Sequence, residues 1–301
     1  MNVTPPFQHR PYDGSSHPFT VGLKPLRENA WLEPDPLLRS HLDEKDRLIA
    51  ANLEAVFRTE SDTDNAQREV LTLIADNLDA YHSSIYEVDP DYVSLRSNDK
   101  RINLSEGPAL LTAARIVQED LVIMRPGPKG YRLVAACLCF PSSWSLAEKF
   151  GQSMTGIHET VPGFNGSRMG QMVARVFENL GTEQILCRFN WSIYPDGQLH
   201  HPEARQIPVE SSEALLAKIF LRVERQTLRR LPGSGDILFT IKIHHDPLSA
   251  LSQQADQADV AEQLKTQLLA LDDDQLAYKG LAPSRNALVE ALGTLALGTE
   301  T

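Results

Sequence analysis

A histidine beside a rigid turn is the first feature of the sequence that could do chemistry. His158 lies in residues 156–164, just before a Val-Pro-Gly turn. Pro162 restricts the backbone and Gly163 permits an unusual dihedral angle, so this loop can hold the imidazole at a set angle. An axial haem or metal ligand requires such an angle. The alternative is a histidine that makes only local hydrogen bonds in an ordered turn.

An arginine on an apolar strand face is the second feature. In a predicted strand, Ile219, Leu221 and Val223 share one face, and counting on by twos adds Arg225 to it. A buried guanidinium is costly unless it is paired, so Arg225 is expected to meet a carboxylate, a propionate or a bound oxygen species. The alternative is a bulge in the strand that turns Arg225 into water.

A polar pair within a core-like strand is the third feature. Residues 184–197 alternate, with Cys187 and Trp191 on the apolar face and Arg188 and Asn190 on the other. Arg188 and Asn190 could form the polar wall of a pocket, or they could be a solvated face of the sheet. Trp191 is expected in the core.

The remaining histidines and a search for common motifs give no further candidate site. His200-His201 and His244-His245 are adjacent pairs at predicted strand ends. Neighbours on a strand point to opposite faces, so neither pair is expected to chelate one metal ion. The sequence contains no HExxH, CxxC, GxSxG, GxGxxG or P-loop motif, which argues against the common hydrolase and nucleotide-binding classes.

Composition narrows the class of protein further. The net charge of −11 argues against a nucleic-acid partner, which usually selects a basic face. The longest apolar run is far shorter than the ~20 residues that span a bilayer, and no secretory signal is visible, so a cytoplasmic protein without a membrane partner is expected. The chain has three cysteines, Cys137, Cys139 and Cys187. They are too few for a disulfide framework, and we expect them in the core.

The pattern of elements predicts an α+β fold. Helical periodicity is found in residues 36–82, most clearly in 66–81, and again in 166–180, 258–271 and 284–295. Strands are predicted in 119–144, 184–197, 217–231 and 236–245, with turns at 126–130 and 232–235. Residues 83–105 give no clear prediction. We expect an irregular, proline-rich arm over 1–35 and a single domain over 36–301, with an antiparallel sheet flanked by N-terminal and C-terminal helices.

Several segments resemble the haem-dependent oxidative N-demethylase family. The resemblance is carried by IHETVPGF at 157–164, RFNWS at 188–192 and RVERQTLRRLP at 222–232. VGLKPL at 21–26 and YKGL at 278–281 match the usual opening and ending of the family. The resemblance therefore spans nearly the whole chain.

This resemblance implies a PAS-like antiparallel sheet that binds haem b and its iron. His158 matches the proximal iron ligand, Arg188 and Asn190 lie in a block expected to contact the cofactor, and Arg225 matches a catalytic residue of the distal pocket. The implied reaction oxidises an N-methyl group of a small methylated amine with dioxygen and releases formaldehyde. A separate flavin and iron–sulfur reductase would supply electrons, because three cysteines cannot hold a four-cysteine cluster.

Two other functions fit the same fold. One is a non-enzymatic haem-based gas or redox sensor, although no kinase, cyclase or DNA-binding module is recognisable in the chain. The other is a cofactor-free binding protein that has kept the fold. His158 and Arg225, which the cofactor-free function does not require, argue against it.

Overall fold

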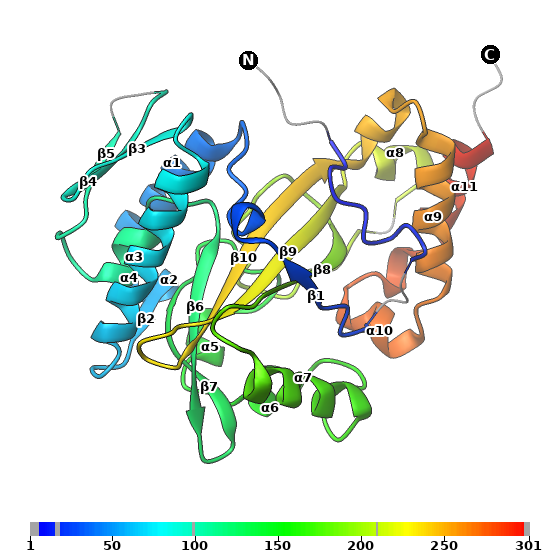
Figure 1. Cartoon of the computed structure of the whole chain (residues 1–301). Coiled ribbons are helices and arrows are strands. Elements are labelled where there is room, and N and C mark those ends of the chain that lie inside the picture. Colours follow the sequence, from blue (N-terminus) through cyan, green and yellow to red (C-terminus); the bar gives the residue numbers. More distant parts are fainter. Residues whose placement is uncertain (1–5, 16–18, 98–99, 209, 298–301) are drawn as a thin grey trace.

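The computed structural model describes residues 6–15, 19–97, 100–208 and 210–297, and a large antiparallel sheet runs through its middle (Figure 1). The strands, in their order across this sheet, are β1 (Lys24–Leu26), β8 (Ile185–Tyr194), β9 (Phe220–Arg230), β10 (Ile237–Pro247), β6 (Asp120–Gly127), β7 (Gly130–Cys137) and β2 (Phe57–Thr59). Neighbouring strands are antiparallel throughout. The mixed α/β architecture with a large antiparallel sheet is therefore confirmed, and the PAS-like topology stays a prediction.

Helices flank this sheet on several sides. The α-helices are α1 (Leu38–Ala51), α2 (Leu53–Val56), α3 (Asp64–Tyr81), α4 (Ala109–Ala114), α5 (Leu146–Lys149), α6 (Met154–Ile157), α7 (Arg168–Asn179), α8 (Ser212–Leu216), α9 (Gln257–Leu269), α10 (Asp273–Tyr278) and α11 (Arg285–Leu297). Figure 1 shows α1 to α4 on one side of the sheet, α9 to α11 on the opposite side, and α6 and α7 below. The helices predicted from periodicity are confirmed by α3, α7, α9 and α11.

Register between the three longest strands defines two faces of the sheet. Arg225 of β9 lies opposite Phe189 of β8 and Lys242 of β10, so these three side chains share one face, the Arg225 face. Glu224 lies opposite Asn190 and therefore belongs to the other face, the Glu224 face. The two faces carry different chemistry, although adjacent residues of one strand supply both.

Several details differ from the sequence predictions. Strand β2 interrupts a stretch predicted to be helical, because it pairs with β7, a contact that local periodicity does not encode. Residues 83–105 form a separate sheet of β3 (Tyr86–Val88), β4 (Tyr92–Leu95) and β5 (Arg101–Asn103). The buried stripe of α7 is narrow, since Val173 and Phe177 are buried whereas the neighbouring Met172 is 45% exposed.

The N-terminal arm is more ordered than its proline content predicts. Within it, β1 pairs with β8, and a 3-10 turn, η1 (Glu28–Ala30), leads to Trp31 and Leu32, which are buried in the main core. Phe7 and Tyr12 are buried in a second core together with residues of α9 and α11. Residues 1–5 and 16–18 of the predicted arm lie outside the described residues. The domain division at residue 35 stays a prediction.

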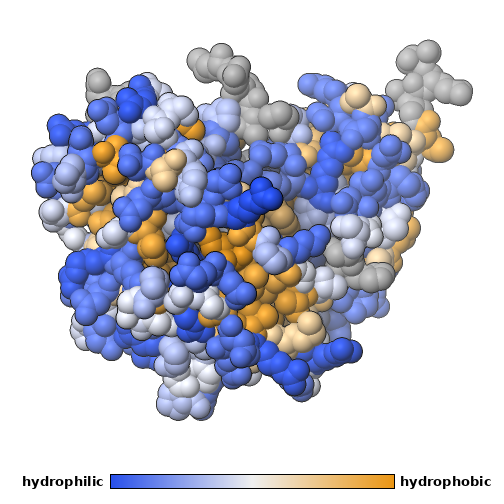
Figure 2. All heavy atoms as spheres, viewed as in Figure 1, coloured by the Kyte–Doolittle hydropathy of each residue, from blue (hydrophilic) through white to orange (hydrophobic). Residues whose placement is uncertain are grey.

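Apolar side chains gather at the centre of one face of the molecule. Figure 2 shows them between β1 and α7, whereas the helices on either side carry mostly hydrophilic side chains with scattered hydrophobic ones. Among the residues described, no helix has both the length and the apolar composition needed to cross a bilayer.

Candidate functional site

The loop that carries His158 is held from both sides. His158 follows α6 directly, and the ring of Phe164 stacks on its imidazole with centroids 4.0 Å apart and an angle of 12° between the planes. Gly163 has a φ of +66°, the left-handed conformation that the predicted turn needs. A Cβ on Gly170 would lie 2.5 Å from the carbonyl oxygen of Phe164, so α7 touches the loop where only glycine fits. These contacts fix the imidazole.

A hydrogen bond determines which ring nitrogen of His158 carries the proton. Nδ1 lies 2.9 Å from the carbonyl oxygen of Met154, which can only accept, so Nδ1–H donates and Nε2 carries the lone pair. Burial lowers the pKa of His158, and the charge of Arg188 lowers it further, so the ring is neutral at pH 7. A neutral imidazole with Nδ1 bonded to a carbonyl group is the arrangement found in histidine ligands of haem iron and other metals. His158 therefore fits a haem ligand.

Arg188 lies on the Glu224 face and has an unsatisfied donor. It stands opposite Gln226 in the pairing of β8 with β9. Its Nε is buried and has no hydrogen-bond partner among the described residues. Burial lowers the pKa of this guanidinium, while Glu224 raises it. Since a buried donor without a partner is costly, the Nε–H of Arg188 is suited to bind an anion such as a haem propionate.

Asn190 belongs to a polar group on the same face. Its Nδ2 lies 3.5 Å from Glu224, whose carboxylate also accepts a 2.6 Å hydrogen bond from Gln226. Lys279 donates to the carbonyl oxygen of Trp191 and lies 3.4 Å from Asn190 Oδ1. The two predicted polar residues of β8 therefore share a face, and they lie beside further charged groups.

Glu224 and Lys279 belong to this polar group, although the sequence analysis did not single them out. Burial lowers the pKa of Lys279 to about 8. Its position depends on Gly280, which has a φ of +68°, and a Cβ there would lie 2.0 Å from the carbonyl oxygen of Arg205. Both residues lie within the matched blocks RVERQTLRRLP and YKGL. Their place in these two blocks is the sequence signal that could have drawn attention to them.

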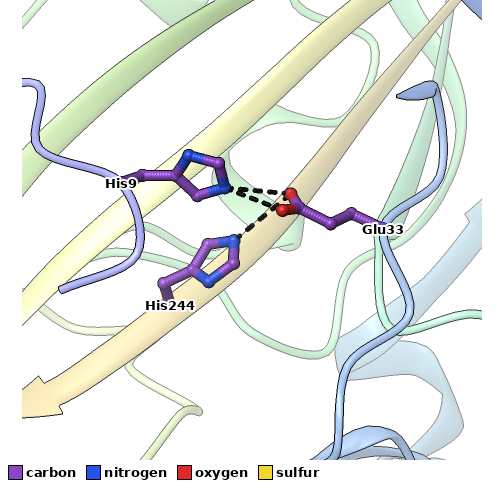
Figure 3. A group of neighbouring side chains, drawn as sticks. All are labelled: His9, Glu33 and His244. Atoms are coloured by element: carbon purple, nitrogen blue, oxygen red, sulfur yellow. Dashed lines mark hydrogen bonds and ion pairs between the residues drawn. The ribbon is translucent and has the colours of Figure 1, made fainter. Parts of the chain in front are cut away.

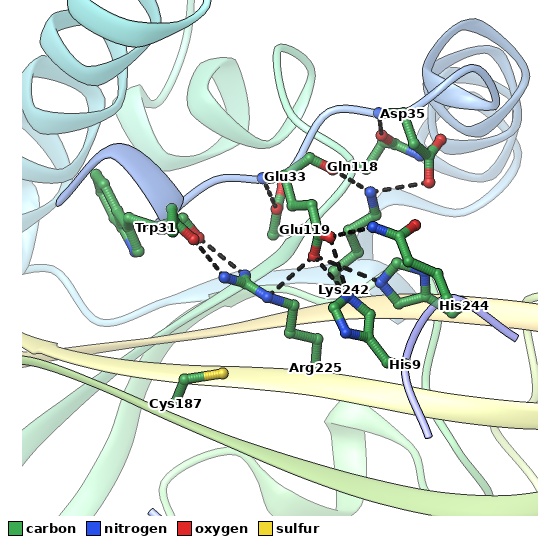
Figure 4. Close-up of polar contacts among 12 residues, drawn as sticks. His9, Trp31, Glu33, Asp35, Gln118, Glu119, Cys187, Arg225, Lys242 and His244 are labelled. Carbon is green, nitrogen blue, oxygen red and sulfur yellow. Dashed lines mark hydrogen bonds and ion pairs between the residues drawn. The ribbon is translucent and has the colours of Figure 1, made fainter. Parts of the chain in front are cut away.

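Arg225 lies on the opposite face and is fully engaged (Figure 4). It is 4% exposed, and its Nε lies 3.0 Å from the carboxylate of Glu33. Its other two nitrogens donate to the carbonyl oxygens of Trp31 and Ala30. The prediction that Arg225 is buried and meets an anion is confirmed, and the alternative of a solvated bulge is wrong. The structure brings His158 close enough to Arg188 for the two charges to interact, and Asn190 shares the face of Arg188, but Arg225 lies on the opposite face.

The cysteines are buried in the core, and three of the four paired histidines bond to backbone carbonyl groups. All three cysteines are free and buried, as predicted. His200 Nδ1 donates to the carbonyl of Cys139 at 2.8 Å, and His201 Nε2 and His245 Nε2 lie 2.8 Å from the carbonyls of Gln198 and Asp196. These three rings therefore stabilise the backbone of neighbouring segments through hydrogen bonds.

A comparison with known protein families covers most of the chain. The family model described as haem-dependent oxidative N-demethylase, alpha subunit-like, matches residues 22–289. This range contains His158, Arg188, Asn190, Glu224 and Lys279. A haem requirement agrees with the lone pair of His158 Nε2 and the unpaired donor of Arg188. The chain belongs to the haem-dependent oxidative N-demethylase, alpha subunit-like family.

Proposed function

We propose that this chain binds haem b and oxidises an N-methyl group of a small methylated amine, releasing formaldehyde and the demethylated amine. Each turnover would consume one dioxygen, two electrons and two protons. The observation that carries the proposal is the orientation of His158, whose Nδ1–H donates to Met154 and leaves the Nε2 lone pair for a ligand bond. Membership of the family supports a haem-dependent oxidative activity. Bound haem supplies the iron that activates dioxygen.

The residues of the chain would orient the cofactor and balance its charge. His158 would hold the iron, with its ring fixed by Phe164 and its proton by Met154. Arg188 would donate its unpaired Nε–H to a propionate. Asn190, beside Glu224, would contact the cofactor from the same face. Together these groups supply one ligand atom, one cation and a polar wall.

A role for Arg225 in the distal haem pocket would require its guanidinium to break its present contacts. To stabilise a bound oxygen species, its guanidinium would have to leave Glu33 and two backbone carbonyls, Trp31 and Ala30. The arrangement favours a positioning role, in which Arg225 holds the N-terminal arm against the sheet. A catalytic role for Arg225 stays a prediction.

Electrons would come from a separate reductase. The three cysteines are buried in the core, and a four-cysteine iron–sulfur cluster needs one more thiolate. We therefore propose a flavin and iron–sulfur protein as the partner.

The test is an absorption titration of the purified protein with hemin, beside His158→Ala and His200→Ala. His200 is the matched control, because it is half-buried and its Nδ1 also bonds a carbonyl. We expect a sharp Soret band in the wild type and in His200→Ala, and a lost or shifted band in His158→Ala. Formaldehyde release would then be measured with methylated amines and a chemical or enzymatic reductant.

Three outcomes would contradict the proposal in whole or in part. Absence of specific haem uptake by the wild type would overturn it entirely, and an unchanged spectrum in His158→Ala would overturn the ligand assignment. Tight binding of carbon monoxide or dioxygen without amine oxidation would replace the enzyme by a haem-based sensor.

A further inference from the structure

Three side chains from distant segments meet where the N-terminal arm crosses the Arg225 face (Figure 3). His9 comes from the arm, Glu33 from the segment before α1, and His244 from β10. His9 Nε2 lies 2.9 and 3.0 Å from the two carboxylate oxygens of Glu33, and His244 Nε2 lies 3.7 Å from Oε2. One nitrogen or oxygen of each residue lies within 4.8 Å of the others.

His244 has an unsatisfied nitrogen that points into this group. The residue is 7% exposed, and its Nε2 has no hydrogen-bond partner in the described part of the chain. Glu33 Oε2, at 3.7 Å, is beyond hydrogen-bond distance. Burial lowers the pKa of His244, so the ring is neutral at pH 7. A buried polar atom in this state calls for a partner that the protein itself does not supply.

The spacing of the three groups suits a metal ion. Tetrahedral zinc with bonds of about 2.0–2.1 Å places its ligand atoms about 3.3 Å apart. The observed separations of 2.9 to 3.7 Å around Glu33 bracket this value. Two imidazoles and one carboxylate are also a common zinc ligand set that leaves a fourth position for water.

The surroundings of the carboxylate orient it and balance its charge. Arg225 Nε lies 3.0 Å from Glu33 Oε2, as donors behind a ligand carboxylate commonly do. The nearby cation Lys242 is paired with Asp35 at 2.9 Å. Asp246, which accepts a hydrogen bond from the backbone of Phe7, adds a further carboxyl group near His9 and His244. The added charge of an ion is therefore partly offset by the groups around it.

We propose that His9, Glu33 and His244 bind one divalent transition-metal ion, for which Zn²⁺ is the best fit, and that the ion fastens the N-terminal arm to the sheet. The site lies on the Arg225 face, so it is separate from the candidate haem site on the Glu224 face. The two histidines of the pair His244-His245 therefore have different roles. His244 would bind the ion together with His9 and Glu33, whereas His245 bonds to the backbone carbonyl of Asp196.

The experiment is a calorimetric titration of the chelator-treated full chain with Zn²⁺ alone, supported by the visible spectrum of Co²⁺. The variants are His9→Gln and His244→Gln, and the control is His200→Gln. We expect one ion per chain in the wild type and in the control, a dissociation constant at least tenfold higher in both variants, and a Tm that Zn²⁺ raises only in the wild type and the control.

Two results would overturn the site. The first is the absence of stoichiometric binding by the wild type. The second is equal binding by the wild type and His9→Gln, which would place the ion elsewhere. His9 lies on the arm and is only half-buried, so its variant remains informative if the buried His244→Gln fails to fold. The readout is ion binding, and it is therefore independent of haem loading and of amine oxidation.

Discussion

Two arginines on neighbouring strands of one sheet have opposite surroundings. Arg225, on one face, has a partner for each guanidinium nitrogen: Glu33 and two backbone carbonyls. Arg188, on the other face, has a buried Nε without a hydrogen-bond partner among the residues described. Both lie within motifs that carry the family resemblance. Their motifs alone do not distinguish them, but their hydrogen bonds do.

The difference separates a structural role from a binding role. A buried cation that has a partner for each nitrogen stabilises the contact that it makes, and removing it leaves those partners unpaired. A buried cation with a spare donor costs free energy until a ligand arrives. The Arg225 face is therefore where the arm is fastened, whereas the Glu224 face holds a spare donor, as the proposed haem site requires.

The largest effect is expected from Arg225→Ala. This substitution leaves Glu33 and two carbonyl groups without their donor, so the free energy of unfolding should fall by about 3–5 kcal/mol. Urea denaturation measures the change. Arg39→Ala is the control, because Arg39 is 65% exposed on α1 in a 3.6 Å pair, and its loss should cost about 1 kcal/mol or less. Equal losses in the two variants would contradict the fastening role.

Acid should weaken the network on the same side through His41. Gln118 Nε2 donates to His41 Nδ1 at 3.0 Å and to Asp35 at 2.8 Å. Burial lowers the pKa of His41 to about 4, although Asp35 opposes the shift. Below the ordinary pKa of about 6.5, the unfolded chain holds a proton that the folded chain does not, so stability falls as the pH falls from about 6.5 to about 4.

The contribution of His41 to this loss should be about 3 kcal/mol, from a shift of about 2.5 units at about 1.36 kcal/mol each. Urea denaturation of the wild type and His41→Gln at pH 7 and pH 4.5 measures it. The difference at pH 7, where His41 is neutral in the folded protein, gives the cost of the substitution itself. Parallel losses of stability in the two proteins would refute the assignment.

Local periodicity predicted the parts of the fold that local sequence controls. The alternation in β8 put Arg188 on the polar side of its strand, the alternation in β9 put Arg225 on the apolar side of its own strand, and helical periodicity over 66–81 predicted α3. The cost of burying a guanidinium also predicted that Arg225 meets an anion. Its identity was not predictable, because Glu33 lies in the arm, far away along the chain.

The same limit applies to the groups that meet only after folding. Lys279 reaches Asn190 and Trp191 from the C-terminal helices, and His9 reaches His244 from the arm. No local pattern links such distant segments. The motif blocks indicated which segments matter, whereas the register of β8 and β9 shows which of their residues share a face.

The smallest effect, and the most direct test of the comparison, is Arg188→Leu. If Arg188 holds a propionate through one charge-assisted hydrogen bond, its loss should weaken haem binding about tenfold, or about 1.4 kcal/mol. The free energy of unfolding without haem should stay unchanged or rise, because a buried donor without a partner is removed. Hemin titration and urea denaturation measure the two quantities, with Arg39→Leu as the control for charge. A loss of stability like that of Arg225→Ala would show that the two arginines share a structural role, and unchanged haem affinity would remove Arg188 from the site.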